Sequence, residues 1–379
     1  MAEVVWPASR PRGMAALKGC ATSMDDDDAC RVREGEHLDW PRLIAWLRER
    51  LADCDIPGFD PRRQPEIAQF PGGHSNLTYL FRFGGADVVV RRPPFGPVAP
   101  KAHDMAREFH WLAAMHEAFP LAPRPYVLCE DSGVIGSVFY AMERRHGVVV
   151  RTDEPAQIAA PADRRRLSDA VVTALSGLHA VDVAGGTLSA LGKPAGFVAR
   201  QVTGWTDRWH RAKTTPLAEM EDLARWLQQH LPPDAIPPAV VHGDFKLDNL
   251  MLDPGDIGRI VAVLDWEMSA LGDPLIDLGI LLAYWVPGAA AGPRDALTTV
   301  TDRPGYFGRD EILDRYAATS GRDLSNVRFY ETFAVFKIAV VIQQIYFRYV
   351  QGQTNDARFA ALDRRVAHLA RQAAALAAL

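Results

Sequence analysis

Apolar residues along this chain follow two spacings, which divide it into a strand-rich part and a helix-rich part. Short apolar runs bounded by Gly, Pro or Asp are typical of strands. Five such runs precede residue 143, and a stretch of helical spacing over 102–118 separates the third from the fourth. The predicted strands are 67–70, 77–83, 88–92, 126–130 and 138–142.

Helical spacing dominates outside this part of the chain. Leu43, Ile44, Leu47 and Leu51 recur three or four positions apart and predict a helix within 38–54. After Gly147 the same spacing predicts further helices, with residues 185–215 as a connector between two of them. Strands followed by helices indicate an α+β protein. The later predicted helices are 161–181, 220–231 and the region from 309 to the C-terminus.

Residues 1–36 lack this periodicity. They contain an acidic run ending at Asp28, and Met14 and Met24 are alternative start positions. We expect either a disordered extension or a start assigned too early. The predicted organisation is therefore an extension over 1–36, a sheet-bearing N-lobe over 37–143 and a helical C-lobe over 144–379.

The region between residues 240 and 265 carries the strongest candidate chemistry. Asp244 follows one short apolar run, Asp265 follows another, and Asn249 lies between them. Turn residues at 253–258 predict a hairpin of 250–252 and 259–264. That hairpin would bring Asn249 and Asp265 to the same end, with Asp244 on the preceding loop.

Two carboxylates and a carboxamide in one cleft would form an oxygen-rich site. Such a site suits Mg²⁺, which takes few protein ligands and shares the remaining positions with water and phosphate. The alternative is that each residue caps a helix or forms a turn, as Asp and Asn commonly do. The order and spacing of all three together favour the metal site.

Composition and charge exclude several classes of protein. The chain has 379 residues, of which 48% are hydrophobic, so it can bury a large core. Its formal net charge of −5, with both signs interspersed, argues against a nucleic-acid partner. Four scattered cysteines and the lack of a visible secretory signal predict a cytoplasmic protein with reduced thiols. The longest apolar stretches, 278–286 and 333–345, are too short or too interrupted to predict a membrane span.

The pattern over 240–267 is similar to the catalytic loop and magnesium aspartate of protein kinases. The His-Gly-Asp start and the Asp-Trp-Glu motif at 265–267 resemble the aminoglycoside phosphotransferase (APH-like) family of small-molecule kinases. The resemblance implies a protein-kinase-like two-lobe fold that uses ATP and Mg²⁺. It implies that Asp244 accepts or orients the proton of the acceptor hydroxyl. It also implies that Asn249 and Asp265 hold the metal against the ATP phosphates.

The same resemblance assigns nucleotide-binding residues in the N-lobe. Arg91 would take the place of the phosphate-binding lysine on the third strand, with Arg92 as the alternative, and Glu108 would pair with it. Met142 and Glu143 would occupy the hinge that binds adenine. The loop between the first two strands would approach the phosphates through backbone N–H groups and a hydroxyl. Its residues are Gly73, His74, Ser75 and Asn76.

The resemblance leaves the acceptor open. Spans such as 74–80 and 90–94 are similar to the kinase-like domain fused to some acyl-CoA dehydrogenases, which implies a hydroxy acid or hydroxyacyl-CoA as acceptor. An aminoglycoside is the other candidate. Asp277 and His179 are expected to have structural roles. Two other functions compete with a kinase: an inactive nucleotide-binding or scaffold protein, suggested by Arg in place of Lys at 91, and a metal-dependent hydrolase. The oligomeric state is left open.

Overall fold

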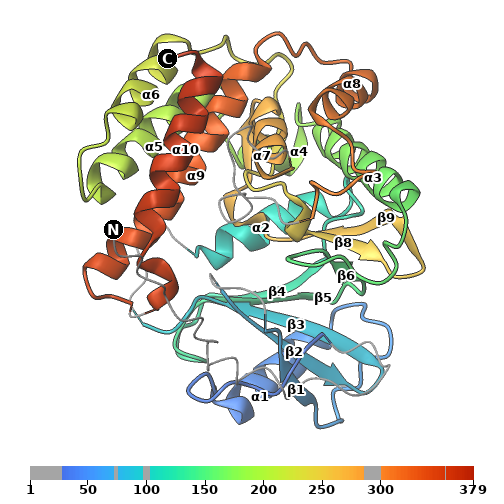
Figure 1. Ribbon diagram of the computed structural model, residues 1–379. Coiled ribbons are helices and arrows are strands. Elements are labelled where there is room, and N and C mark those ends of the chain that lie inside the picture. The colour runs from blue at the N-terminus through green and yellow to red at the C-terminus, as the bar shows by residue number, and fades with distance from the viewer. Residues whose placement is uncertain (1–27, 72–75, 97–102, 286–299, 355) are drawn as a thin grey trace, which may run out of the picture.

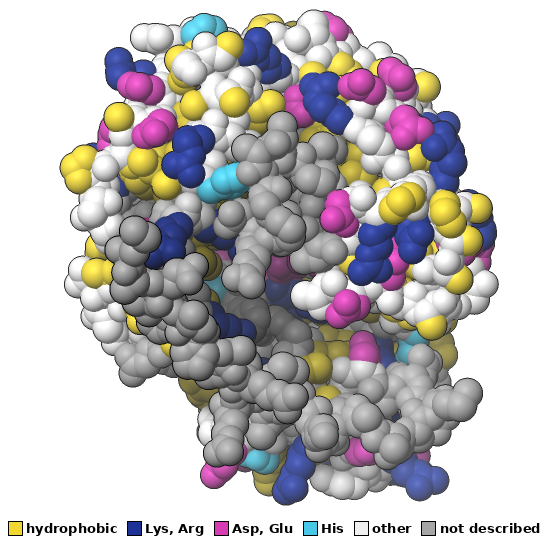
Figure 2. Space-filling model, viewed as in Figure 1, with side chains coloured by type: hydrophobic (Ala, Val, Ile, Leu, Met, Phe, Trp, Pro, Cys, Tyr) yellow, Lys and Arg dark blue, Asp and Glu magenta, His cyan; other side chains and the backbone are white. Residues whose placement is uncertain are grey.

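The computed structural model describes residues 28–71, 76–96, 103–285, 300–354 and 356–379. A small lobe built on a sheet lies against a larger helical lobe (Figure 1). The surface is hollowed between them, with acidic and basic side chains in the recess (Figure 2). This arrangement is the predicted α+β fold.

The N-lobe sheet is antiparallel throughout, with strand order β1-β2-β3-β5-β4. Its faces are covered by α1 (Trp40–Leu51) and α2 (Met105–Met115). Val88 and Val90 pack with the side chains of α1, whereas Val89 packs with those of α2, as strand alternation requires. The strands are β1 (Glu66–Gln69), β2 (Leu77–Phe83), β3 (Ala86–Arg92), β4 (Pro125–Cys129) and β5 (Phe139–Glu143).

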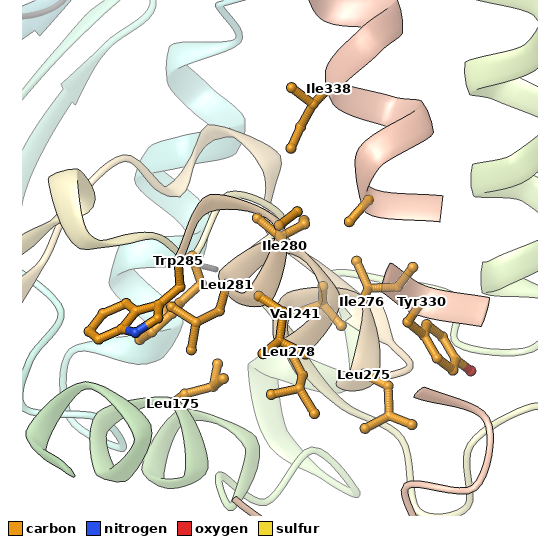
Figure 3. Close-up of a cluster of buried hydrophobic side chains, with 14 of the residues drawn as sticks. Leu175, Val241, Leu275, Ile276, Leu278, Ile280, Leu281, Trp285, Tyr330 and Ile338 are labelled. Atoms are coloured by element: carbon orange, nitrogen blue, oxygen red, sulfur yellow. The ribbon is translucent and has the colours of Figure 1, made fainter. Parts of the chain in front are cut away.

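The C-lobe surrounds a fully buried helix, α7 (Leu275–Trp285). Every residue of α7 except Tyr284 is buried, and α7 packs against α9 (Val327–Val350), which explains why its sequence is apolar on all sides. Figure 3 shows its side chains meeting Leu175 of α3 and Ile338 of α9. The remaining helices are α3 (Pro161–His179), α4 (Gly186–Ala190), α5 (Phe197–Ala212), α6 (Ala218–Gln229), α8 (Arg309–Ser320) and α10 (Leu362–Ala377).

Short strands in the C-lobe position the candidate chemistry. The predicted hairpin is confirmed: β8 (Leu250–Asp253) pairs with β9 (Asp256–Val263), and β6 (Val148–Val149) lies beside β8. β7 (Ala239–Val241) pairs with β10 (Ala270–Gly272). Single helical turns follow: η1 (Leu247–Asn249) and η2 (Trp266–Met268), with η3 (Ala357–Phe359) near the C-terminus.

Two predictions about the chain's organisation are wrong. Residues 185–215 are not a connector, since α4 and α5 occupy most of them and α5 buries Trp205 and Trp209. Residues 28–36 are not a disordered extension, since Ala29 is buried and Cys30 pairs with Gln69 of β1. Residues 1–27, with Met14 and Met24, lie outside the described residues.

One helix in the described part of the chain, α9, is long and apolar enough to cross a membrane by length and composition alone. Half of its most apolar window is buried inside the protein, against α5, α7 and α10. Packing within the C-lobe is therefore sufficient to account for its apolar sequence.

Candidate active site

The loop that carries Asp244 is fixed by the residues just before it. His242 is buried, its Nε2 donates to the carbonyl of Leu264 (2.9 Å), and its Nδ1 accepts from the N–H of Asp244 (3.3 Å). Gly243 has φ +83°, and a Cβ there would lie 2.8 Å from the carbonyl oxygen of Met268. Only glycine fits this close approach, which explains the His-Gly-Asp sequence.

A buried carboxylate beneath the loop holds the same two residues. Asp277, in the first turn of α7, accepts from the N–H groups of His242 (2.6 Å) and Gly243 (2.7 Å). Nε2 of His179 lies 3.4 Å from this carboxylate, and its Nδ1 lies 2.7 Å from the hydroxyl of Tyr316. These contacts fit the structural roles expected for Asp277 and His179.

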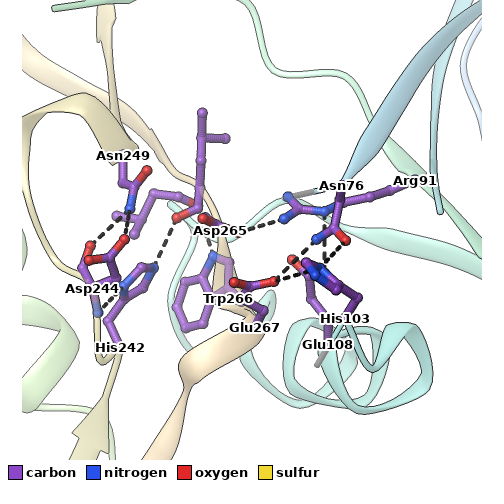
Figure 4. A network of polar contacts seen from close by, with 12 residues as sticks. Asn76, Arg91, His103, Glu108, His242, Asp244, Asn249, Asp265, Trp266 and Glu267 are labelled. Atoms are coloured by element: carbon purple, nitrogen blue, oxygen red, sulfur yellow. Dashed lines mark hydrogen bonds and ion pairs between the residues drawn. The ribbon is translucent and has the colours of Figure 1, made fainter. Parts of the chain in front are cut away.

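The structure brings Asp244, Asn249 and Asp265 close together (Figure 4), and Asn249 and Asp265 line the recess between the lobes. Nδ2 of Asn249 donates to the backbone carbonyl of Asp244 (2.9 Å) and to its Oδ2 (3.0 Å). The N–H of Leu264 donates to the carbonyl of Asn249 (2.8 Å), so the hairpin sets Asp265 beside this pair. Asp265 has φ +68°, a strained conformation that is typical of functional positions.

Arg91 joins the sheet to these carboxylates. Its Nε lies 3.3 Å from Oε2 of Glu108, and its Nη2 lies 2.5 Å from Oδ1 of Asp265. Burial raises the pKa of Glu108 to about 7, against the lowering effect of Arg91. Arg92 points to the opposite face, where its guanidinium lies 4.1 Å from the Phe95 ring centroid. Of the two arginines, Arg91 is therefore the one that faces the site.

A second polar cluster ties Asn76 to the Asp-Trp-Glu segment. Nδ2 of Asn76 donates to Oε2 of Glu267 (3.2 Å), and its Oδ1 lies 2.8 Å from Nδ1 of His103 (Figure 4). Arg107 donates to the backbone carbonyls of Glu267 and Ser269. Burial raises the pKa of Glu267, and the charge of Asp265 adds to this shift. Gly73, His74 and Ser75 lie outside the described residues.

Two lysines that the sequence analysis did not assign surround Asp244. Nζ of Lys246 lies 3.0 Å from Oδ2 of Asp244, and Lys337 of α9 is buried and donates to the carbonyl of Gly243 (2.5 Å). Burial raises the pKa of Asp244, but the charges of Lys246 and Lys337 more than offset this effect and leave it lowered. Asp244 is therefore kept as a carboxylate, the form that can accept a proton.

A cavity of about 240 Å³ lies between the lobes. Met142 and Glu143, the predicted hinge residues, line it. The N–H of Glu143 already donates to the carbonyl of Arg124 (2.8 Å), so a base would use other backbone groups of this segment. The other lining residues include Asn76, Arg91, Glu108, Asn249 and Asp265.

The donor atoms at this site fit Mg²⁺. Because Nδ2 of Asn249 donates to Asp244, its Oδ1 remains for a cation beside the Asp265 carboxylate. Within the described ranges, no group of three or more His, Cys, Asp or Glu side chains could hold a metal alone. Two oxygen ligands suit a metal that completes its shell with phosphate and water.

A sheet lobe over a helical lobe, with carboxylates in the crevice, is the architecture of kinase-like phosphotransferases, and this is the class that the fold defines. The chain belongs to the Phosphotransferase enzyme family, abbreviated APH, whose sequence profile matches residues 66–312. The resemblance drawn from 240–267 is thereby confirmed.

Curated relatives carry the same domain within longer proteins. Mouse Acyl-CoA dehydrogenase family member 10 is 36% identical over 297 residues, which cover 77% of this chain and 27% of that protein. Human Acyl-CoA dehydrogenase family member 11 is 33% identical over 337 residues, which cover 87% of this chain and 42% of that protein. The chain thus spans less than half the length of these relatives.

Solved structures share the fold across nearly the whole chain. A Ralstonia eutropha protein provisionally named an aminoglycoside phosphotransferase has 30% identity and a TM-score of 0.74, covering 90% of this chain and 99% of that one. A Cryptosporidium parvum choline kinase, at 10% identity, has a TM-score of 0.62 with 88% and 95% covered. An aminoglycoside phosphotransferase solved with GDP and kanamycin, at 14% identity, has a TM-score of 0.58 with 88% and 98% covered. The latter two show the fold alone.

Proposed function

We propose that this protein is an ATP-dependent kinase that transfers the γ-phosphoryl group to a hydroxyl of a small molecule. The observation that carries the proposal is the meeting of Asn249 and Asp265 in one recess, with Asp244 bonded to Asn249 and with Arg91 bonded to Asp265 from the opposite lobe. Phosphoryl transfer needs mainly positioning and charge neutralisation, and this set supplies both.

Each residue has a distinct task in this proposal. Asp244, whose pKa is lowered by Lys246 and Lys337, accepts the proton of the acceptor hydroxyl or orients that hydroxyl. Asn249 and Asp265 hold Mg²⁺, which when bound neutralises charge on the ATP phosphates. Arg91, fixed by Glu108, contacts phosphate oxygens through its planar fork.

The charges near Asp244 favour an anionic acceptor over a polycationic one. Lys246 lies 4.9 Å from the Tyr284 ring centroid, and the charges of Lys246 and Arg365 oppose the effect of burial, which raises the pKa of Tyr284 to about 12. On the side toward α5, Arg208 lies 4.4 Å from the Trp205 ring centroid. Lys246 is paired with Asp244 and lies 3.8 Å from Asp248, so the preference for a hydroxy acid or hydroxyacyl-CoA over an aminoglycoside rests on Arg208 and Arg365.

An ATP-consumption screen over hydroxy acids, hydroxyacyl-CoAs and aminoglycosides tests the proposal. We expect turnover with anionic acceptors, and Arg208→Ala should raise their KM about tenfold while the exposed Arg225→Ala control leaves it unchanged. Turnover confined to aminoglycosides would refute the anionic acceptor.

Other outcomes separate the competing functions. Tight Mg²⁺-ATP binding without turnover of any acceptor would favour the inactive scaffold. Phosphate release from ATP that depends on no added acceptor would favour the hydrolase. We also propose a cytoplasmic location, which agrees with the free thiols of Cys54 and Cys129.

A further inference from the structure

Residues 28–36, which we call the N-terminal strap, pack along the outer edge of the sheet beside β1. Cys30 and Gln69 exchange two backbone hydrogen bonds of 2.7 Å, as paired antiparallel strands do. The buried side chain of Gln69 binds the strap again, since it accepts from the N–H of Arg33 (2.9 Å) and donates to Glu36 (2.5 Å). The strap is therefore fixed to the N-lobe at several points.

The first residue of the strap reaches the segment that joins the two lobes. Oδ1 of Asp28 lies 3.0 Å from Nη2 of Arg144, and Oδ2 of Asp87 on β3 lies 2.8 Å from Nη1 of the same guanidinium. Arg144 directly follows β5, and its side chain is only 5% exposed. A single buried cation thus connects the strap, β3 and the predicted hinge.

These residues also belong to the cavity that holds the candidate metal site. Asp28 and Arg144 line it together with Asp265. Phe70, which directly follows β1, lines it too, and its ring centroid lies 5.9 Å from the Arg144 guanidinium carbon. Asp28 enters the cavity from the sheet edge, whereas Asp265 enters it from the C-lobe hairpin. A nucleotide anchored at Asp265 would extend along a wall that the strap helps to form.

We propose that the strap forms part of the nucleotide pocket, and that Asp28 is a positioning residue that sets nucleotide affinity by holding Arg144. This inference rests on the proposed function, because it takes the cavity as the site of Mg²⁺-ATP. Without the Asp28 carboxylate, Arg144 keeps its ion pair with Asp87 but loses the charged contact that joins it to the first residue of the strap. Asp28 is 51% exposed, so the effect on the nucleotide Kd is moderate, about threefold to tenfold.

The test compares two substitutions within the strap. Asp28→Asn keeps the shape of the side chain and removes its charge, whereas Glu34→Gln makes the same chemical change at an exposed position and is the matched control. Calorimetric titration measures the Kd of Mg²⁺-ATP without acceptor. Hydrogen–deuterium exchange measures protection of the strap amides with and without Mg²⁺ and AMP-PNP.

We expect Asp28→Asn to raise the Kd and the KM for ATP together by about threefold to tenfold, with a smaller effect on kcat. Nucleotide should slow exchange of the wild-type strap amides, and Glu34→Gln should behave as wild type.

Equal Kd values in all three proteins would overturn the inference. It would also be overturned if nucleotide did not change the hydrogen–deuterium exchange of the strap amides. A lowered Tm with unchanged Kd would show that Asp28 only stabilises the fold. Wild-type protein that binds no nucleotide would instead refute the proposed function, and the role of the strap with it.

Discussion

The carboxylate of Asp277 provides a quantitative test of how the catalytic loop is held. Asp277→Asn keeps the shape of the side chain but replaces one of two acceptor oxygens with an NH₂ group, so the N–H of His242 or Gly243 loses its acceptor. A hydrogen bond to a charged group contributes ~1.5–3 kcal/mol, and a buried unsatisfied N–H costs ~1–3 kcal/mol. These two figures describe the same loss, so we expect destabilisation of about 2–3 kcal/mol and, for a chain of 379 residues, a Tm lower by roughly 2–4 °C.

The same substitution should reduce catalysis, because Asp244 directly follows the two residues that Asp277 holds. We expect kcat to fall about tenfold or more while the KM for ATP changes little, since Asp277 does not line the cavity. Calorimetric melting and steady-state kinetics measure both effects. Asp182→Asn is the matched control, because its exposed carboxylate also accepts a backbone N–H, from Ala184 (2.9 Å). Wild-type Tm and kcat in Asp277→Asn would refute the reasoning.

Three further predictions concern charged groups of the site. Asp265→Ala should weaken nucleotide binding about tenfold and remove its Mg²⁺ dependence, and titrations in which that dependence persists would reject Asp265 as a ligand. Burial raises the folded-state pKa of Glu108 from 4.5 to about 7, so its stabilising contribution is complete below about 4.5 and is lost as the pH rises through 7. The Tm of Glu108→Gln should not show this loss of stability as the pH rises. Parallel Tm–pH curves for the variant and the wild type would contradict the raised pKa of Glu108. Lys337→Met should raise the pKa of Asp244 and move the acid limb of kcat/KM to higher pH, whereas an unmoved limb would remove Lys337 from this role.

Local patterns in the sequence were sufficient to predict much of the sheet and the catalytic hairpin. Strand 77–83 has the predicted bounds, and the turn at 253–258 joins β8 and β9 as expected. The choice between Arg91 and Arg92 needed the structure, because alternation shows that neighbours face opposite sides but not which side is the site. The position of Val89 against the residues of α2 supplies that answer.

Contacts between distant residues could not be predicted from spacing. Lys337 contacts the carbonyl of Gly243, which lies 94 positions away in the sequence. A lysine within an apolar helix does not indicate which residue its charge will meet. Arg107 belongs to no motif in the sequence, yet it donates to the backbone carbonyl of Glu267, 160 positions away. The ordered structure of residues 28–36 could not be predicted, because pairing at the edge of a sheet uses backbone groups and requires no apolar periodicity in the sequence.

The central claim is that Asp244, Asn249 and Asp265 form one site for phosphoryl transfer. Transfer of labelled γ-phosphate from ATP to an accepted hydroxyl compound, compared between wild type and Asp244→Asn, tests it most directly. We predict that acceptor-dependent transfer falls by about 100-fold or more in the variant, while the Kd of Mg²⁺-ATP stays within about twofold of wild type. Near-normal transfer by Asp244→Asn would contradict the claim.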